Sequence, residues 1–351
     1  MTWRNRLRGK WLILLPGIIL VKLAASSPYF IEKYYASGFY PATSTLQRYV
    51  LGWVPFSIGD LLYLLAGISI LWLLVKAFRY LRSDTKTKSG LLLGVGNLIS
   101  IIICIYLSFN ILWGLNYNRN SPAARFGLVE QDSAAAPELA RISAILLDKT
   151  NRSRPSHFIS FARSRAIAID LFKEQGPLHV IPASIKPSLF GKLGNYMGYS
   201  GYYNPFSGEA QVNTTVPDFL IPFVTCHEMA HQAGFAKENE ANFVGFLAAR
   251  KSTDSSMLYS TYFNMFLYAN GQLRRLDSAV ARSNYEKLSA GALADLASYR
   301  LFLKKYDSPL GTFVDAFYDR YLKLNQQPAG AMTYNRVVLW LLAYYKKNGD
   351  L

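Results

Sequence analysis

Cysteines, charged residues and repeats are scarce in this sequence, and their scarcity narrows the possible classes of protein. Only two cysteines occur, Cys104 and Cys226, which excludes a secreted fold held together by several disulfides. Charged residues make up 17% of the 351 positions, a low share for a soluble protein. No internal repeat or low-complexity segment occurs, so nothing in the sequence indicates a repeat architecture.

Hydrophobic residues, by contrast, make up 51% of the chain, and the mean hydropathy of +0.11 indicates that part of it lies in lipid. Three apolar segments, about 11–25, 56–78 and 91–115, approach the roughly 20 residues that a helix needs to cross a bilayer. We therefore predict a membrane domain over residues 1–115 with about three transmembrane helices. The first segment fits either a cleaved signal peptide or an uncleaved anchor.

Much of the net charge of +16 lies beside these apolar segments. Residues 1–115 contain 12 Lys and Arg against 3 Asp and Glu, with basic residues crowded in the N-terminal tail and in the 76–88 loop. The positive-inside rule places both in the cytoplasm, so three crossings put everything after about residue 116 on the extracytoplasmic side. The remaining positive charge forms no clustered basic face, and we expect no nucleic-acid partner.

Between the first two apolar segments, residues 27–55 are rich in Tyr, Phe and Trp and poor in charge. Aromatic residues at this density are typical of the boundary between lipid and water. We predict a partly membrane-embedded loop with a short amphipathic helix, and a lipid bilayer as a partner of the chain.

The second part of the chain has the pattern of a separate domain. Residues 116–137 are the expected linker, and residues 138–351 are the expected domain. Residues 202–213 predict a β-hairpin that turns at Asn-Pro and Ser-Gly. Helical patterns occur near 139–146, 158–172, 239–250, 255–276, 292–305 and 333–347. The predicted fold is therefore mainly α, with N-terminal transmembrane helices followed by an α+β domain that has a small hairpin or sheet before the motif helix.

The strongest motif is HExxH, formed by His227, Glu228 and His231. Two histidines four apart on a helix face one way and can share a zinc ion, with the intervening glutamate beside the metal as general base. With four His and nine Glu in the chain, chance produces this pattern in about one shuffled sequence per thousand. The remaining histidines, His157 and His179, have no partner at ligand spacing.

A catalytic zinc site takes three protein ligands and leaves one position open, so a third ligand is expected near the motif. Gly234 is placed to end the motif helix, after which the chain turns. Glu238 is the preferred ligand, because it shares a helix face with Asn242, which can hydrogen-bond to a ligand. Glu240 is the rival, because it aligns with inward-facing apolar residues.

Substrate-binding residues are less sharply defined. The strand directly before the motif helix, about 209–213, either docks an extended peptide by edge pairing or packs the core as part of a plain hairpin, and the sequence does not choose between the two. Stabilising an oxyanion needs a further donor besides the metal, and Tyr202, Tyr203 and Tyr334 are candidates among which the sequence does not choose.

The segments 202–213, 227–234 and 238–242, with Tyr334 to Val338, resemble a family of uncharacterised bacterial membrane proteins. That family joins a few N-terminal transmembrane helices to an HExxH zinc-protease-like (zincin) domain, which implies a multi-pass protein of the bacterial inner membrane. More distantly, Glu238, Ala241 and Asn242 look like the ExxAD stretch of membrane gluzincins of the CaaX-protease type. There the glutamate binds zinc, although this chain has Asn242 in place of the aspartate.

These observations predict a membrane-anchored zinc metallopeptidase of the zincin type that hydrolyses peptide or protein substrates on the extracytoplasmic, or periplasmic, side. The alternative is a non-catalytic membrane-tethered module that binds zinc or peptide. Glu228 favours the enzyme, since a purely structural zinc site has no use for it and usually closes the fourth position with protein. A transporter is disfavoured, because no ionisable residue marks a pathway in mid-membrane. The sequence does not indicate an oligomeric state.

Overall fold

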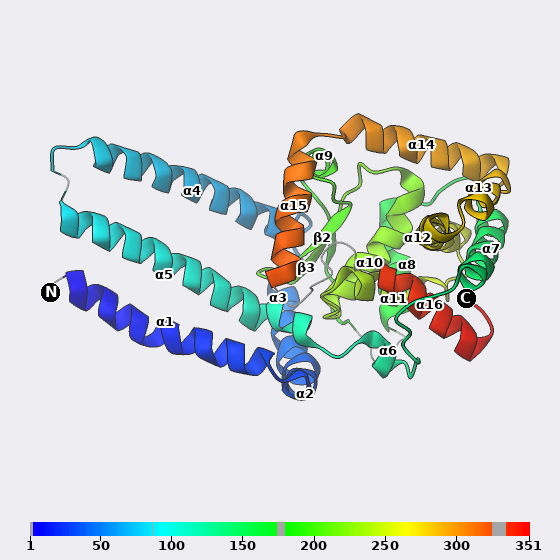
Figure 1. Ribbon diagram of the computed structural model, residues 1–351. Coiled ribbons are helices and arrows are strands. Elements are labelled where there is room, and N and C mark those ends of the chain that lie inside the picture. The colour runs from blue at the N-terminus through cyan, green and yellow to red at the C-terminus, as the bar shows by residue number, and fades with distance from the viewer. Residues whose placement is uncertain (1–2, 86, 174–179, 325–334) are drawn as a thin grey trace.

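The computed structural model describes residues 3–85, 87–173, 180–324 and 335–351. It is mainly helical, with one small sheet among these residues, as the sequence predicts. Three long helices project from one side of a globular body (Figure 1). The N-terminal end of the chain and the connection between the second and third long helices both lie at the end remote from that body.

The long helices are α1 (Trp3–Ala25), α4 (Ile58–Arg82) and α5 (Lys88–Leu112). Among the described residues, α4 and α5 are each long and apolar enough to cross a membrane. Helix α1 satisfies that test only when residues 10–25 are counted together with the bent segment that follows. It runs beside α5, where Lys10 Nζ donates to Asn97 Oδ1 at 3.0 Å (Figure 1).

Residues 28–51 form a continuous helical segment in place of the predicted loop. It consists of α2 (Pro28–Phe30), the π-helix η1 (Ile31–Phe39) and α3 (Tyr40–Leu51), and it is bent by 92° from α1. After α5 come a 3₁₀ turn, η2 (Gly114–Asn118), and the short helix α6 (Pro122–Arg125). The start of the predicted linker is well packed, since Asn116, Tyr117 and Arg119 are all buried.

The helices of the globular body agree closely with the apolar periodicity of the sequence. Three of them, α9, α13 and α15, have no counterpart among the predicted patterns. The bounds are α7 (Ala136–Ser153), α8 (Phe161–Lys173), α9 (Gly191–Tyr196), η4 (Asp218–Leu220), α10 (Ile221–Gln232), α11 (Glu238–Ala249), α12 (Ser255–Leu276), α13 (Ser278–Glu286), α14 (Ala290–Tyr306), α15 (Pro309–Leu324) and α16 (Asn335–Asn348).

The sheet has the strands β1 (Ile185–Pro187), β2 (Gly201–Asn204) and β3 (Glu209–Val212), in the order β1-β3-β2. Strands β2 and β3 are the predicted hairpin, with Gly201 opposite Val212. Strand β3 also pairs in parallel with β1, which the sequence did not reveal. The expectation that a peptide pairs with residues 209–213 is therefore wrong, because both edges of β3 are already occupied. Strand β2 lies at the edge of the sheet.

The motif helix α10 lies near the middle of the body, packed against α11, α8 and the sheet (Figure 1). Its neighbour α11 is buried from Asn239 to Ala249. Phe243, Phe246 and Phe263 are among the fully buried side chains of this core. Polar residues on so buried a helix must be paired, which directs attention to the histidines and carboxylates of α10 and α11.

Candidate metal centre

Helix α10 ends where the sequence predicts, at a glycine turn. Gly234 has a φ of +88°, its N–H donates to His231 O at 2.8 Å, and Phe235 N–H donates to Ala230 O at 3.1 Å. This pair of bonds is the Schellman motif, which needs a left-handed residue and so favours glycine. The turn reverses the chain so that α11 begins at Glu238, next to the two histidines.

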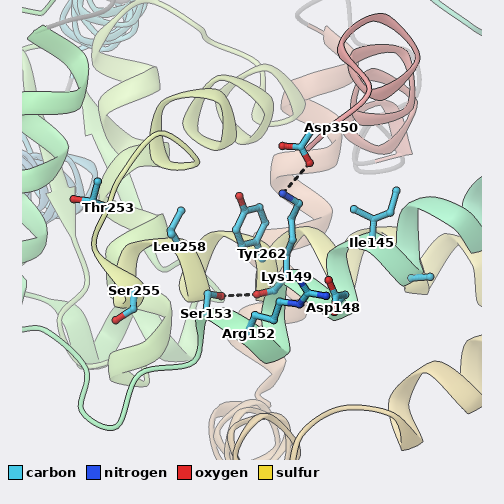
Figure 2. Close-up of a pocket in the computed structure, with 11 residues that line it drawn as sticks. Ile145, Asp148, Lys149, Arg152, Ser153, Thr253, Ser255, Leu258, Tyr262 and Asp350 are labelled. Atoms are coloured by element: carbon cyan, nitrogen blue, oxygen red, sulfur yellow. Dashed lines mark hydrogen bonds and ion pairs between the residues drawn. The ribbon is translucent and has the colours of Figure 1, made fainter.

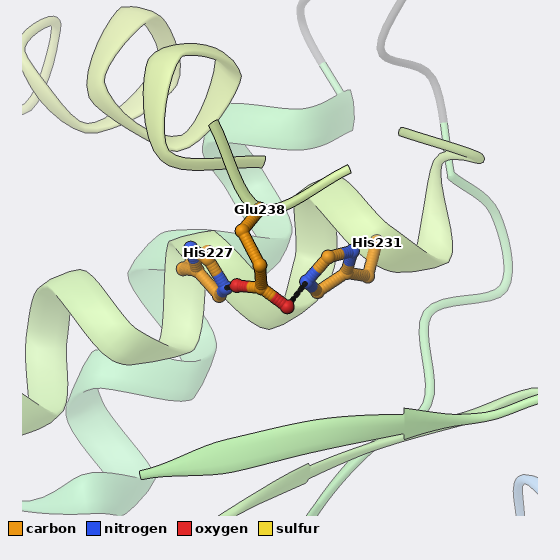
Figure 3. A group of neighbouring side chains, drawn as sticks. All are labelled: His227, His231 and Glu238. Atoms are coloured by element: carbon orange, nitrogen blue, oxygen red, sulfur yellow. Dashed lines mark ion pairs between the residues drawn. The ribbon is translucent and has the colours of Figure 1, made fainter. Parts of the chain in front are cut away.

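The three predicted ligands come together in the structure. His227 Nε2 lies 3.2 Å from Glu238 Oε2, and His231 Nε2 lies 3.6 Å from Glu238 Oε1 (Figure 3). The three donor atoms fall within 4.8 Å of one another, and they form a group of metal-ligand type among the described residues. Glu240 points elsewhere and forms an ion pair with Lys237 at 3.0 Å. Of the two candidate carboxylates, therefore, the structure brings Glu238 to the histidines.

Both histidines are held by their outer ring nitrogens. His227 Nδ1 lies 3.0 Å from Asn242 Oδ1, and His231 Nδ1 lies 2.7 Å from Phe235 O. Each partner is a carbonyl-type oxygen that can only accept, so each Nδ1 carries the proton in the neutral ring. Both Nε2 atoms face Glu238: they hydrogen-bond to its carboxylate when the rings are protonated, and their lone pairs can bind a cation when the rings are neutral. This arrangement is the one in which protein histidines bind metals, with the second nitrogen fixed by a hydrogen bond.

The residues present fit a zinc ion. Two imidazoles and one carboxylate are a ligand set of catalytic zinc sites, which leave a fourth position open. Burial opposes ionisation of Glu238, but hydrogen bonds from the two histidines hold the pKa of its carboxyl well below the ordinary value. Burial also disfavours the charged form of His231, yet the Glu238 carboxylate raises its pKa to about 9. A metal cation between the three groups would be attracted to the Glu238 carboxylate in the same way as the histidine protons.

Glu228 projects beside this cluster without being part of it. Its side chain is 2% exposed, and its Oε2 has no hydrogen-bond partner in the structure. Burial raises the pKa of this carboxyl to about 7. A Cβ atom added at Gly201 of β2 would lie 2.5 Å from Glu228 Oε1, so only glycine lets the carboxylate approach the edge strand so closely. A buried carboxylate oxygen without a partner, beside a ligand cluster, is expected where a water molecule takes part in the chemistry.

The tyrosines proposed as oxyanion donors are engaged elsewhere or lie outside the described residues. The hydroxyl of Tyr202 donates to Asp60 Oδ1 at the start of α4. The hydroxyl of Tyr203 is hydrogen-bonded to that of Tyr40 at 3.3 Å, and it is the donor, because Tyr40 uses its one proton for the Gln232 carbonyl. Tyr334 lies outside the described residues, as does His179, whereas His157 is exposed.

Two residues that lie near the cluster could not be identified from the sequence, because neither belongs to a recognisable motif. Tyr268 of α12 lies beside Asn242 and Glu238, and burial raises the pKa of its hydroxyl, as do the charges of Tyr299 and Glu238. Trp113, directly after α5, donates from its indole to His231 O at 3.4 Å. Only the folded chain brings these residues to the motif, because they are more than 25 positions from it in sequence.

Surface hollows occur away from the cluster. The larger has a volume of about 790 Å³ and is lined mainly by α7 and the start of α12 (Figure 2). Its charged residues pair with one another, as Lys149 does with Asp350 at 2.9 Å and Arg152 with Asp148 at 2.9 Å. These pairs leave little free charge in the hollow for a ligand.

Residues 35–342 match the model of a family described as "Protein of unknown function (DUF3810)". The match covers most of the membrane part and the whole metal cluster. No curated protein and no solved structure matches the chain.

Proposed function

The chain belongs to the DUF3810 family of proteins of unknown function, and we propose that it is a membrane-anchored zinc-dependent metallopeptidase. One observation carries this proposal. The donor atoms of His227, His231 and Glu238 lie within 4.8 Å of one another, and beside them is the buried carboxylate of Glu228, whose Oε2 has no hydrogen-bond partner. A purely structural zinc site has no use for such a carboxylate and usually closes its fourth position with protein.

His227, His231 and Glu238 would hold the zinc ion, and Asn242 and the Phe235 carbonyl would orient the two imidazoles. Zinc in such a site supplies Lewis-acid chemistry, since it polarises a carbonyl and makes water acidic near neutral pH. Glu228 then accepts a proton from the attacking water and delivers it to the leaving nitrogen of the peptide. Its buried position beside β2 supports this role.

The substrate would lie along β2, the edge strand. The Asn213 N–H donates to Ser200 O at 2.8 Å, and bonded pairs alternate along an antiparallel ladder. By this alternation, Tyr202 and Gln211 are a hydrogen-bonded pair. Gly201 belongs to a non-bonded pair, so its backbone N–H and C=O point away from β3, toward the open edge of β2. Gly201 also borders Glu228, so a peptide paired at this position has its backbone close to the proposed base.

The proposed location is the bacterial inner membrane, with α1, α4 and α5 as three crossings and the globular body on the periplasmic side. The arrangement of the long helices supports this topology. The N-terminal end of the chain and the α4–α5 connection lie at the same end of the bundle, away from the body (Figure 1). These are the two basic segments that the positive-inside rule assigns to the cytoplasm.

The test is a pair of substitutions in the full-length protein purified in detergent without chelator. The parent should contain about one zinc per chain, which is the stoichiometry of a single three-ligand site, and His227→Ala should lose it. Glu228→Gln should keep the zinc and lose peptide cleavage. A parent without zinc, or a Glu228→Gln variant that cleaves as fast as the parent, contradicts the proposal. A zinc-loaded parent that binds peptides without cleaving any of them indicates a binding module.

A further inference from the structure

The metal helix is held by the part of the chain that borders the membrane. The last carbonyls of a helix have no hydrogen-bond donor within the helix. At the end of α10 and in the turn that follows it, side chains from other elements donate to the carbonyls. Trp113, one residue after the end of α5, donates to His231 O at 3.4 Å. Tyr40 of α3 donates to Gln232 O at 2.8 Å, and Arg119 donates to Gly234 O at 3.1 Å.

Aromatic packing reinforces this attachment. The indole of Trp113 lies edge-on to the ring of His231, with 6.1 Å between ring centroids, and also packs on Tyr203 of β2 at 5.5 Å. Tyr40 and Trp113 are both buried, and they belong to a second core that links α1, η1 and η2 with β2. The metal ligands and the edge strand are thus fixed directly to the ends of the membrane helices.

Helix α3 has the composition of a helix that lies on lipid. Its buried stripe, Tyr40, Ser44 and Arg48, faces the globular body. Tyr49 on its outer surface is 66% exposed, and Trp53 just beyond its end is 77% exposed. The segment containing α3 is bent by 92° from α1, so it runs along the membrane plane if α1 crosses it. An apolar, aromatic face in this orientation is typical of an interfacial helix.

These contacts set the height of the metal centre. With its exposed face on lipid, helix α3 would separate the bilayer from the end of α10, to which Tyr40 is bonded, and a helix with its side chains is about 10–12 Å across. The ligands therefore lie on the order of one helix diameter above the membrane surface. An extended chain covers about 3.3–3.6 Å per residue, so about three to four residues bring a peptide from the surface to the site.

We propose that this site acts on juxtamembrane segments of membrane-anchored polypeptides, and that it cleaves them within a few residues of the bilayer. This inference rests on the proposed peptidase function. An anchored substrate shares the plane of the membrane with the site, which raises its effective concentration over that of a free peptide. A site at this height also selects for a short distance between the anchor and the cleaved bond.

The experiment reconstitutes the full-length, zinc-loaded protein in liposomes with three pools of substrates. Each pool carries the same randomised segment, either on a single-span helix with a Gly/Ser spacer of about 5 residues, on the same helix with about 30 residues, or as a free peptide. Mass spectrometry identifies the cleaved bonds, and Glu228→Gln is the control for every pool. We expect the short-spacer pool to be cleaved at least about tenfold faster than the free peptide, because of its effective concentration. It should also be cleaved faster than the long-spacer pool.

Equal cleavage of the free peptide, or faster cleavage with the long spacer, overturns the inference while the peptidase function stands. If the zinc-loaded parent cleaves none of the pools, the proposed function itself has failed. A second measurement needs no activity, because brominated lipids quench only tryptophans that contact them. The lipids should also quench tryptophans of the membrane helices, such as Trp72 of α4. The fluorescence that Trp53→Phe removes should itself be quenched by these lipids. If that component is not quenched, α3 does not lie on the bilayer and the inference is wrong.

Discussion

Asn242 offers a sharp test of how the metal ligands are positioned. Its Oδ1 accepts from His227 Nδ1 at 3.0 Å, and the side chain is 2% exposed. Substitution to alanine removes the acceptor and leaves the imidazole N–H in a buried place where water does not readily replace it. The zinc-bound ring needs this tautomer, because Nε2 must be unprotonated to bind the metal. Without metal, the His227 ring can change tautomer or turn to avoid the unpaired N–H. Losing the hydrogen bond therefore destabilises mainly the zinc-bound protein.

The expected loss of zinc affinity follows from the cost of the missing hydrogen bond. An unsatisfied buried polar group costs about 1–3 kcal/mol. Since 1.4 kcal/mol corresponds to a tenfold change in a binding constant, Asn242→Ala should weaken zinc binding by about 10- to 100-fold. The same range is typical of substitutions in the residues that orient metal ligands. Asn242→Asp keeps an acceptor oxygen in place and should bind zinc at least as tightly as the parent.

Competition with a chromogenic chelator, at one pH and in one detergent, measures these affinities. The matched control is Asn239→Ala, because Asn239 lies on the same helix and is equally buried, but its Oδ1 has no hydrogen-bond partner in the structure. This control should bind zinc like the parent. The reasoning is refuted if Asn242→Ala binds as tightly as the parent, or if both alanine variants lose affinity equally.

Three further predictions concern other parts of the chain. Gly201→Ala should force the Glu228 carboxylate aside and lower kcat by about 10- to 100-fold while zinc content is unchanged, whereas Gly271→Ala, where a Cβ meets open space, should have little effect. Lys186→Met removes the cation paired with the fully buried Glu209, and it should lower the free energy of unfolding by about 3–5 kcal/mol in thermal denaturation experiments. Adding Glu209→Gln should recover most of that loss. A reporter fused after the last residue should be active only outside the cytoplasm.

Each of these predictions has a distinct opposing result. Unchanged kcat in Gly201→Ala would show that a Cβ at this position does not displace the proposed base. A double variant at 186 and 209 that is no more stable than Lys186→Met would mean that the uncompensated charge is not the source of the loss. A reporter that is active in the cytoplasm would exclude the topology with three crossings.

The metal cluster was largely predictable because its information is local. The spacing of His227 and His231, the glycine at 234 and the acidic residues soon after it all lie within a short segment. The patterns at 239–250 and 255–276 also gave the bounds of α11 and α12 closely, and Gly234 gave the end of α10. The choice between Glu238 and Glu240 required the structure, because both lie in the first turn of α11 and only the turn angle decides which one faces the histidines.

Other features could not be predicted because they depend on distant parts of the chain. Strand β1 has three residues and pairs with a strand more than 20 positions away, so neither its length nor its pattern is distinctive. The contact of Trp113 with His231 joins residues that only the fold brings together. The linker prediction was based on polar composition, which does not reveal that residues such as Asn116 are buried against the globular body.

The turn at Gly234 also has a consequence for how the proposed metal would be acquired. All three proposed ligands lie on one helical hairpin, with six residues between His231 and Glu238. Closing so short a loop costs little chain entropy, and local contacts of this kind form early in folding. The ligand set can therefore assemble during synthesis, before helices α12 to α16 have emerged. A metal bound at that stage would fix the α10–α11 hairpin, against which the later helices then pack.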